Sequence, residues 1–274
     1  QRTARKPVKN MSIKLYWDGG DKTEVNFGDT ISPKIVEIIS GKPVSYAGIY
    51  ECDMIAIGSL LDKVIRRQWK RLARFNWRKT HVWGTGSFGT DMVGQHKFLN
   101  VSAVRGPMTR KLMGLPADLP LGDPGLFVNQ MVKPASKTHR WGIIPHVTDR
   151  QLPIVTEMQK QTPNTCIIDL GNPDLQETIE NIQRCEFIIS SSLHGLIAAD
   201  ALGVPNTWMR ISGNVNGGDW KFHDYFLSVD RPAYAPVTPQ VNLKHHEDGI
   251  TCAGASIIAQ RQQELQTAFK KTGL

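Results

Sequence analysis

The stretch Phe187-Ile-Ile-Ser-Ser-Ser-Leu-His-Gly-Leu-Ile-Ala-Ala-Asp200 decides the fold, because it reads as a strand, a polar turn and a helix in direct succession. Its first three residues form an apolar run about as long as a buried strand. Helix-forming apolar residues fill 196–202, and Gly203-Val-Pro205 ends that segment. Such a turn lies at the carboxyl end of a strand, where open α/β sheets bind ligands.

The turn itself carries groups that suit an anionic ligand. Ser190, Ser191 and Ser192 bring hydroxyls and backbone N–H groups to a helix N-terminus, where anions bind readily. Leu193 and His194 follow, and a histidine exchanges protons near neutral pH. A purely structural interpretation also fits, in which the serines cap the helix and His194 satisfies a polar contact in the core.

A second turn of this character lies near the N-terminus. We expect a strand over 11–17 and a helix over 30–39, with Asn26-Phe-Gly-Asp29 between them. Asn26 and Asp29 would then lie at the carboxyl edge of the sheet, and Gly28 would allow close approach of the backbone. An Asx-rich turn that merely starts a helix would look the same in sequence.

Three further predicted strands, over 53–61, 81–86 and 98–104, end in small or basic residues. The glycines of the second strand end leave room for a ligand near the backbone, although a lone Gly-x-Gly is a weak signal. Arg105 follows the third strand, and its two-pronged guanidinium suits a carboxylate or a phosphate.

The alternation continues after a polar segment at 133–140, which we interpret as a linker between domains. We therefore predict two Rossmann-like α/β domains with parallel sheets that face a cleft, at 11–134 and 140–274. The predicted elements of the second domain are strands at 141–146, 165–170, 187–189 and 206–210 and helices at 154–161, 174–184, 196–202 and 255–270. The turns described above would open into the cleft.

Composition and charge narrow the class of protein. The chain has 274 residues with 40% hydrophobic and 21% charged content, as in ordinary globular proteins, and no apolar run is long enough to span a membrane. Its net charge of +8 indicates an anionic partner. The four cysteines form no C-x-x-C pair, so we expect no zinc site, no disulfide framework and a cytoplasmic location. The chain does not begin with Met, which leaves a lost anchor or signal open.

Much of the positive charge lies in 66–79, where seven Lys or Arg are interleaved with Trp69, Leu72, Phe75 and Trp77. As a helix, this segment would be an amphipathic surface element suited to an anionic membrane interface, where the protein would bind peripherally. The same pattern could bind nucleic acid, or form a solvated face whose aromatic side chains dock on the domain. Between the two kinds of partner we favour a membrane surface and expect no nucleic acid.

Seven short motifs point to a family. They are Asn26-Phe-Gly-Asp29, Trp83-Gly-Thr-Gly86, Val104-Arg-Gly-Pro107, Gly122-Asp-Pro124, Gly142-Ile-Ile-Pro-His146, Ser191-Ser-Leu-His-Gly195 and Asp219-Trp-Lys-Phe-His-Asp-Tyr225. Each motif is weak alone, but together and in this order they resemble those of polysaccharide pyruvyl transferases, over about 15–230 of the chain. The resemblance implies a fold similar to the two-domain GT-B type of glycosyltransferase, with the site in the cleft.

The resemblance also implies a reaction. The family transfers the carboxyethylidene group of phosphoenolpyruvate to two hydroxyls of one sugar, which forms a pyruvate ketal and releases phosphate. Phosphoenolpyruvate is the donor substrate, and neither a metal nor a further cofactor is implied. The acceptor would be a sugar or a lipid-linked oligosaccharide that serves as a polysaccharide precursor.

Roles for individual residues follow from the same resemblance. Family members contact phosphoenolpyruvate with an Arg-Leu-His motif, and here Ser192, Leu193 and His194 occupy its place. Because serine replaces arginine, the positive charge must come from elsewhere. Arg105 is the first candidate for that charge, with Lys221 and Arg210 behind it.

The chemistry needs an acid, a base and cations. We expect His194 to protonate the methylene carbon of the donor and Asp29 to take the proton of the acceptor hydroxyl, although the two could exchange roles. Asn26 would orient a substrate oxygen, and the N–H and hydroxyl groups of Ser190 to Ser192 would help to hold phosphate and carboxylate. His146 could take part, but a structural role at a strand end suits it better.

Two other classes of function stay open. The nearest is a glycosyltransferase or sugar epimerase of similar fold that uses a nucleotide-sugar. The second is a basic protein without catalytic activity that binds a membrane or nucleic acid. Removal of His194 would leave the function of the binding protein intact and would slow the enzyme by about a hundredfold or more.

Overall fold

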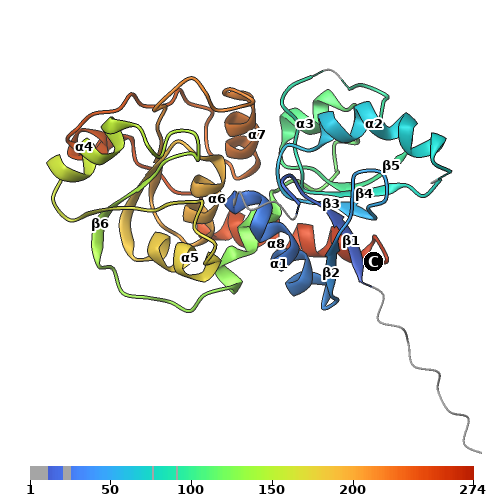
Figure 1. The fold of residues 1–274 in the computed structure, drawn as a ribbon, viewed down its shortest axis with the longest axis horizontal. Coiled ribbons are helices and arrows are strands. Elements are labelled where there is room, and N and C mark those ends of the chain that lie inside the picture. The colour runs from blue at the N-terminus through green and yellow to red at the C-terminus, as the bar shows by residue number, and fades with distance from the viewer. Residues whose placement is uncertain (1–11, 21–25, 76, 91) are drawn as a thin grey trace, which may run out of the picture.

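A computed structural model describes residues 12–20, 26–75, 77–90 and 92–274, and it contains two parallel β-sheets with helices around them (Figure 1). The first sheet has five strands in the order β2-β1-β3-β4-β5, and every neighbouring pair is parallel. Its strands are β1 (Ile13–Tyr16), β2 (Val44–Tyr46), β3 (Met54–Ile55), β4 (Thr80–Trp83) and β5 (Leu99–Ala103). Helices follow three of them, namely α1 (Phe27–Ser40), α2 (Leu61–Ala73) and α3 (Pro107–Leu112).

The second sheet has four parallel strands in the order β7-β6-β8-β9. They are β6 (His139–Ile144), β7 (Thr165–Ile167), β8 (Cys185–Ser190) and β9 (Asn206–Trp208). The accompanying helices are α4 (Pro153–Gln161), α5 (Leu175–Gln183), α6 (Leu193–Ala201) and α7 (Trp220–Ser228). The two sheets confirm the predicted α/β class with parallel strands, whereas the likeness to the GT-B type stays a prediction.

Helix α6, from the stretch that opened the sequence analysis, is buried almost completely. Each of its residues except His194 is buried. It packs against β8, β9, α5 and the 3-10 helix η1 (Pro124–Gln130). A helix that is apolar on all sides belongs in a core, which explains why 196–202 shows no amphipathic period. His194 is thus the one residue of α6 that the fold leaves partly accessible.

The two sheets share one hydrophobic core. A single cluster of buried residues includes Leu15 of β1, Ile144 of β6 and Leu196 of α6. The last helix, α8 (Ala255–Lys270), returns to the first sheet, where the indole N–H of Trp83 donates to the carbonyl of Leu265 at 2.8 Å. The predicted domain ranges 11–134 and 140–274 therefore stay a prediction, to which the structure adds that the last helix packs on the first sheet.

A 3-10 helix, η2 (Leu243–Gly249), completes the regular elements of the described ranges. The linker was predicted over 133–140. Residues 133–138 have no regular structure, whereas 139 and 140 already belong to β6. In the described part of the chain, no helix is long and apolar enough to cross a membrane.

Candidate active site

The carboxyl ends of strands from both sheets face one cavity of about 320 Å³. Asp18 follows β1, Ser59 follows β3, His146 follows β6 and Ser192 follows β8, as expected for ligand sites of parallel sheets. The cavity is lined by Asp18, Asn26, Asp29, Gly58, Ser59, Leu60, Phe88, His146, Val147, Thr148, Ser192, Leu193, His194, Asn216 and Lys221. The structure therefore brings together the two turns that sequence singled out first.

The imidazole of His194 lies against the backbone of α1. A Cβ atom added to Gly28 would be 2.1 Å from Nδ1 of His194, so only glycine leaves room for the ring. The Nε2 atom is buried and has no hydrogen-bond partner among the described residues. Burial, followed by the charges of Lys221 and Arg105, lowers the pKa of His194 to about 3. The ring is therefore neutral at neutral pH, with one nitrogen free to bond a ligand.

Asp29 lies in the first turn of α1 and lines the same cavity. Burial and the nearby carboxylate of Asp18 raise the pKa of Asp29 to about 7. The side-chain amide of Asn26 donates to Oδ2 of Asp29 at 2.8 Å and opposes this rise. Asp29 can therefore both give and take a proton near neutral pH, which a catalytic acid or base must do.

Lys221, near the start of α7, is the cation of the cavity. Its side chain is only 9% exposed, and Nζ lies 5.4 Å from the centroid of the Phe222 ring. Within the described ranges, no hydrogen bond or ion pair joins Nζ to another group. Burial and the charge of Arg105 lower the pKa of Lys221 to about 8. A buried ammonium without an anionic partner among the described residues fits a site for an anionic ligand.

Arg105 does not line the cavity, although the sequence made it the first candidate to bind the donor. Its side chain is fully buried, and Nε donates to Oδ2 of Asp224 at 3.1 Å. The two Nη atoms donate to Oγ of Ser59 at 2.8 Å and to the carbonyl of Ser87 at 2.9 Å. Because Arg105 has no exposed surface, it reaches the cavity only through Ser59 and through its charge.

The serines of the turn have different surroundings. The Ser190 hydroxyl donates to the carbonyl of Ile144 at 2.9 Å and accepts from the Ser192 N–H at 3.0 Å. The Ser191 hydroxyl donates to Oδ2 of Asp149 at 2.7 Å. Ser190 and Ser191 therefore fix the shape of the turn, and Ser192 is the serine that lines the cavity. The side chain of Ser192 makes no capping hydrogen bond at its helix, so the capping interpretation is wrong for this residue.

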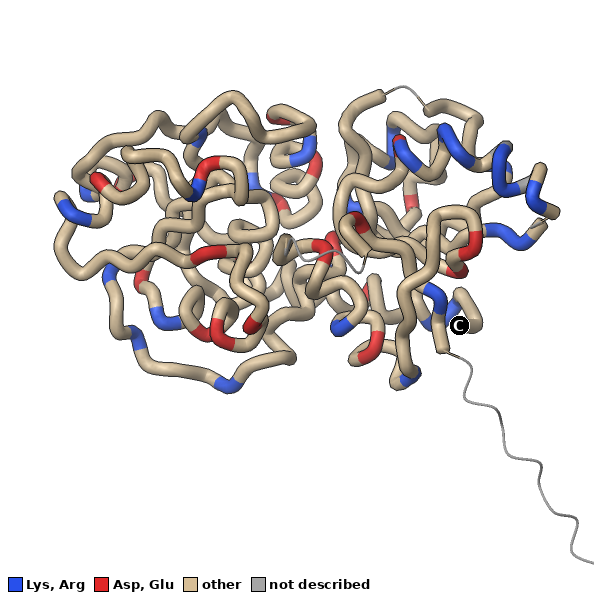
Figure 2. Tube along the Cα trace, viewed as in Figure 1, with Lys and Arg blue, Asp and Glu red and all other residues tan. Residues whose placement is uncertain are grey.

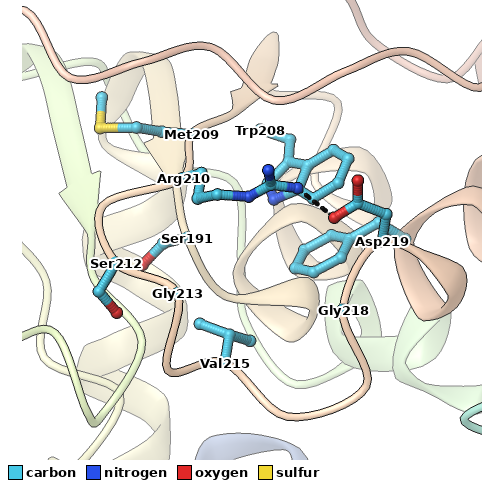
Figure 3. Close-up of a pocket in the computed structure, with 10 residues that line it drawn as sticks. Ser191, Trp208, Met209, Arg210, Ser212, Gly213, Val215, Gly218 and Asp219 are labelled. Carbon is cyan, nitrogen blue, oxygen red and sulfur yellow. Dashed lines mark hydrogen bonds and ion pairs between the residues drawn. The ribbon is translucent and has the colours of Figure 1, made fainter.

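Arg210 lies in a neighbouring pocket of about 350 Å³, which Figure 3 shows. Its guanidinium forms an ion pair with Asp219, and the two side chains are 48% and 45% exposed. The rings of Trp208 and Phe222 stack 4.2 Å apart in the wall of this pocket. Arg210 therefore lies outside the cavity that holds His194, although chain neighbours such as Ser191 and Ser192 line the two spaces.

Sequence reasoning missed several polar residues of the site region, three of which hold its parts together. Asp149 is fully buried and accepts hydrogen bonds from Ser191 and from Ser212, so it ties two loops together. Asp224 anchors Arg105, and Ser59 carries the contact from Arg105 to the cavity. Asp224 stood inside a quoted motif, and Asp149 follows another by three residues, but their side-chain partners lie far away in sequence.

In the described ranges, no group of three or more His, Cys, Asp or Glu side chains is arranged as metal ligands would be. The four cysteines are free. The expectation that the reaction needs neither a metal nor a cofactor stays a prediction.

A family model and two known proteins are similar in sequence to this chain. The family model for polysaccharide pyruvyl transferase matches residues 3–213. The succinoglycan biosynthesis protein ExoV of Rhizobium meliloti is 25% identical over 232 residues, which cover 81% of this chain and 67% of that protein. An uncharacterized protein of Acanthamoeba polyphaga mimivirus is 28% identical over 196 residues, which cover 65% of this chain and 68% of that protein. The chain belongs to the polysaccharide pyruvyl transferase family.

Proposed function

We propose that this protein transfers the carboxyethylidene group of phosphoenolpyruvate to two hydroxyls of one sugar in a polysaccharide precursor. The products would be a cyclic pyruvate ketal and phosphate. Family membership supports a pyruvyl transferase. The observation that carries the finer proposal is the cavity itself. It holds a neutral imidazole, a carboxyl with a pKa of about 7 and a buried cation that has no ion pair with any residue the structure describes.

The donor would bind through charge and backbone groups. Phosphoenolpyruvate carries a phosphate and a carboxylate, and Lys221 is the cation that can contact either. The first turn of α6, at Leu193 and His194, offers backbone N–H groups at the positive end of a helix. Arg105, which is buried and does not line the cavity, would add positive potential without contacting the donor.

Donor binding would also prepare the acid. In the free protein, burial and then the positive charges of Lys221 and Arg105 hold the pKa of His194 down to about 3. An anionic donor beside Lys221 cancels part of that repulsion and raises the pKa of His194. We therefore propose that His194 gains its proton when phosphoenolpyruvate binds, and then delivers it to the methylene carbon.

The later steps form the two carbon–oxygen bonds of the ketal and release phosphate. Protonation of the methylene makes the neighbouring carbon electrophilic, and a sugar hydroxyl bonds to it while Asp29 takes the hydroxyl proton. The bond from that carbon to the phosphate oxygen then breaks, and phosphate leaves with the electron pair. The second hydroxyl closes the ring and releases its proton. One of the two hydroxyl protons thus replaces the proton that His194 delivered, and the other leaves with the phosphate or to solvent.

The acceptor would extend from the cavity into the pocket of Arg210 and Asp219. Ser191 and Phe222 line that pocket, and their chain neighbours Ser192 and Lys221 line the cavity, so the two spaces adjoin. The exposed ion pair offers donors and acceptors for sugar hydroxyls. We further propose a GT-B-like arrangement of the two sheets around this site and, because the cysteines are free, a cytoplasmic reaction on a lipid-linked precursor.

Phosphate release from phosphoenolpyruvate tests the proposal. It would be measured with lipid-linked acceptors that end in galactose, glucose, mannose or N-acetylmannosamine, for the natural protein, for His194→Ala and for His245→Ala, a control at an exposed histidine. We expect release that requires an acceptor, that falls about a hundredfold or more in His194→Ala and that is unchanged in the control. Silence across the panel together with tight binding of a nucleotide-sugar would overturn the proposal in favour of a glycosyltransferase.

A further inference from the structure

The surface formed by residues 66–79, which we call the α2 surface, combines exposed cations with exposed aromatic rings. It comprises the second half of α2 and the turn that leads to β4. Figure 2 shows a row of Lys and Arg positions along the outer end of α2. Phe75 is 85% exposed and Trp77 is 70% exposed. The side chains of Trp69 and Leu72, which sequence also counted in this pattern, lie outside the described part.

The described residues on either side of the two rings are tied to the fold by Arg71. Arg71 is buried, and its guanidinium donates to the carbonyl of Cys52 at 3.0 Å and to that of Arg78 at 3.1 Å. Phe75 has φ 59°, a left-handed conformation that is rare for a bulky residue. The fold thus exposes a phenyl ring to water, and it does so at a backbone conformation that disfavours a bulky residue. Such an exposed apolar ring is expected where a partner covers it.

The charges of the α2 surface indicate which kind of partner would bind there. Arg66, Lys70 and Lys79 are exposed and have no acidic partner among the residues that the structure describes. Arg74 is bonded to Glu51 at 3.2 Å and lies 4.2 Å from the Tyr50 ring, so its charge is already balanced. Three unbalanced cations around two protruding rings complement a surface that is negative outside and apolar below.

We propose that the α2 surface docks on a bilayer containing anionic phospholipids, with Phe75 and Trp77 in the headgroup region and the cations on the lipid phosphates. Aromatic rings partition into this region, and each basic residue near an anionic surface adds attraction. Nucleic acid would contact the same cations through its phosphates, but that contact leaves the exposed rings of Phe75 and Trp77 in water. The lipid is therefore the better match.

Docking there would serve the proposed reaction. Leu60, just before α2, lines the cavity, and Lys63 of its first turn pairs with Asp18, another lining residue. A helix of this length spans about 20 Å. One end of α2 thus lies at the cavity and the other at the membrane, which suits an acceptor sugar carried on a lipid. The docking itself is independent of the chemistry and can be measured without turnover.

The test is co-sedimentation of the full chain with vesicles of phosphatidylcholine alone and of three parts phosphatidylcholine to one part phosphatidylglycerol. We expect binding to the anionic vesicles that weakens with salt. Replacing Arg66, Lys70 and Lys79 by Glu should weaken it about a hundredfold or more, since each basic residue contributes roughly tenfold or a little less. The matched control replaces the exposed Lys133, Lys160 and Lys244 by Glu and should weaken it much less.

A second set of variants tests the contribution of Phe75 and Trp77 to vesicle binding. Phe75→Ser with Trp77→Ser should weaken vesicle binding while circular dichroism stays that of the natural protein. Trp77→Phe should keep binding but lose the blue shift of tryptophan emission that anionic vesicles cause. Equal loss in the control triple variant, no binding to anionic vesicles, or tighter binding to short duplex DNA than to vesicles would each overturn the proposal.

Discussion

The Nδ1 atom of His194 occupies the space that a side chain on Gly28 would need, since a Cβ there would lie 2.1 Å away. The two residues belong to helices that follow strands of different sheets, α6 after β8 and α1 after β1. Their contact therefore sets how closely the two sheets approach at the cavity. It also sets the position of the imidazole, whose Nε2 has no other partner among the described residues.

Gly28→Ala should displace this ring. The added methyl cannot fit, so the imidazole or α1 must move, and overpacking of this kind costs about 1–3 kcal/mol of stability. A shift of about 1 Å at a catalytic group can slow a reaction about a hundredfold. We expect kcat for acceptor-dependent phosphate release to fall by that order. Gly249→Ala is the matched control, since nothing lies within 4 Å of its added Cβ; equal activity of the two variants would contradict the role of this contact.

Sequence reasoning could locate the site because the site depends on topology. The turns at Asn26–Asp29 and Ser192–His194 each follow a strand, and parallel strands place such turns at one edge of a sheet. The bounds of β6 and α6 were predicted to within a few residues, because apolar runs bounded by glycine and proline mark both elements clearly. Helix α8 was predicted with its observed bounds, Ala255–Lys270.

Side-chain partners could not be predicted in the same way. Arg105 looked like a ligand-binding residue because it ends a strand, but Asp224, more than a hundred positions later, takes its guanidinium into the core. Nothing local in the sequence distinguishes an arginine that faces a cavity from one that is paired behind it. Helix α7 was not predicted from the sequence, because its buried Lys221 and Asp224 break the apolar pattern of a core helix.

Breaking the Arg105–Asp224 pair should destabilise the fold strongly. Asp224→Ala leaves a fully buried guanidinium without its anion and also removes the acceptor of the Thr109 N–H and hydroxyl. The expected loss is about 3–5 kcal/mol in the free energy of unfolding, measured by urea titration. Glu180→Gln removes the partly exposed pair with Arg184 and should cost less than about 1 kcal/mol. Similar losses in both variants would contradict the buried role of Arg105.

Lys221 should control donor affinity in a pH-dependent way. The pKa of Lys221 is lowered to about 8, so raising the pH through that value removes the charge that would bind phosphoenolpyruvate. The KM for the donor should therefore be lowest below pH 8 and rise above it. Lys221→Met should raise this KM by about tenfold to a hundredfold at neutral pH and abolish the rise. Lys244→Met, at an exposed position, is the control, and a KM that stays constant above pH 8 in the natural protein would contradict the assignment.

Substitutions in the pocket of Arg210 and Asp219 should change the KM for the acceptor and not the KM for the donor. Asp219→Asn and Arg210→Gln each remove one member of the exposed ion pair, and Asp219 makes no capping hydrogen bond that would complicate the change. We expect the KM for a disaccharide acceptor to rise up to about tenfold, the loss typical of one or two hydrogen bonds. The KM for phosphoenolpyruvate should not change. A change in the donor KM alone would place the pocket on the donor side instead.

The pH profile of kcat/KM should follow the ionisation of the Asp29 carboxyl. Because the pKa of Asp29 is raised to about 7, its carboxylate becomes protonated as the pH falls through 7, and a base in that form cannot accept the hydroxyl proton. We therefore expect activity to fall on the acid side with a midpoint near pH 7. Asp18→Asn removes a neighbouring negative charge and should move that midpoint to lower pH. Asn26→Ala removes a hydrogen bond that favours the carboxylate and should move it to higher pH. Asp248→Asn, at an exposed position, should leave it in place; a midpoint unaffected by both Asp18 and Asn26 would mean that another group is the base.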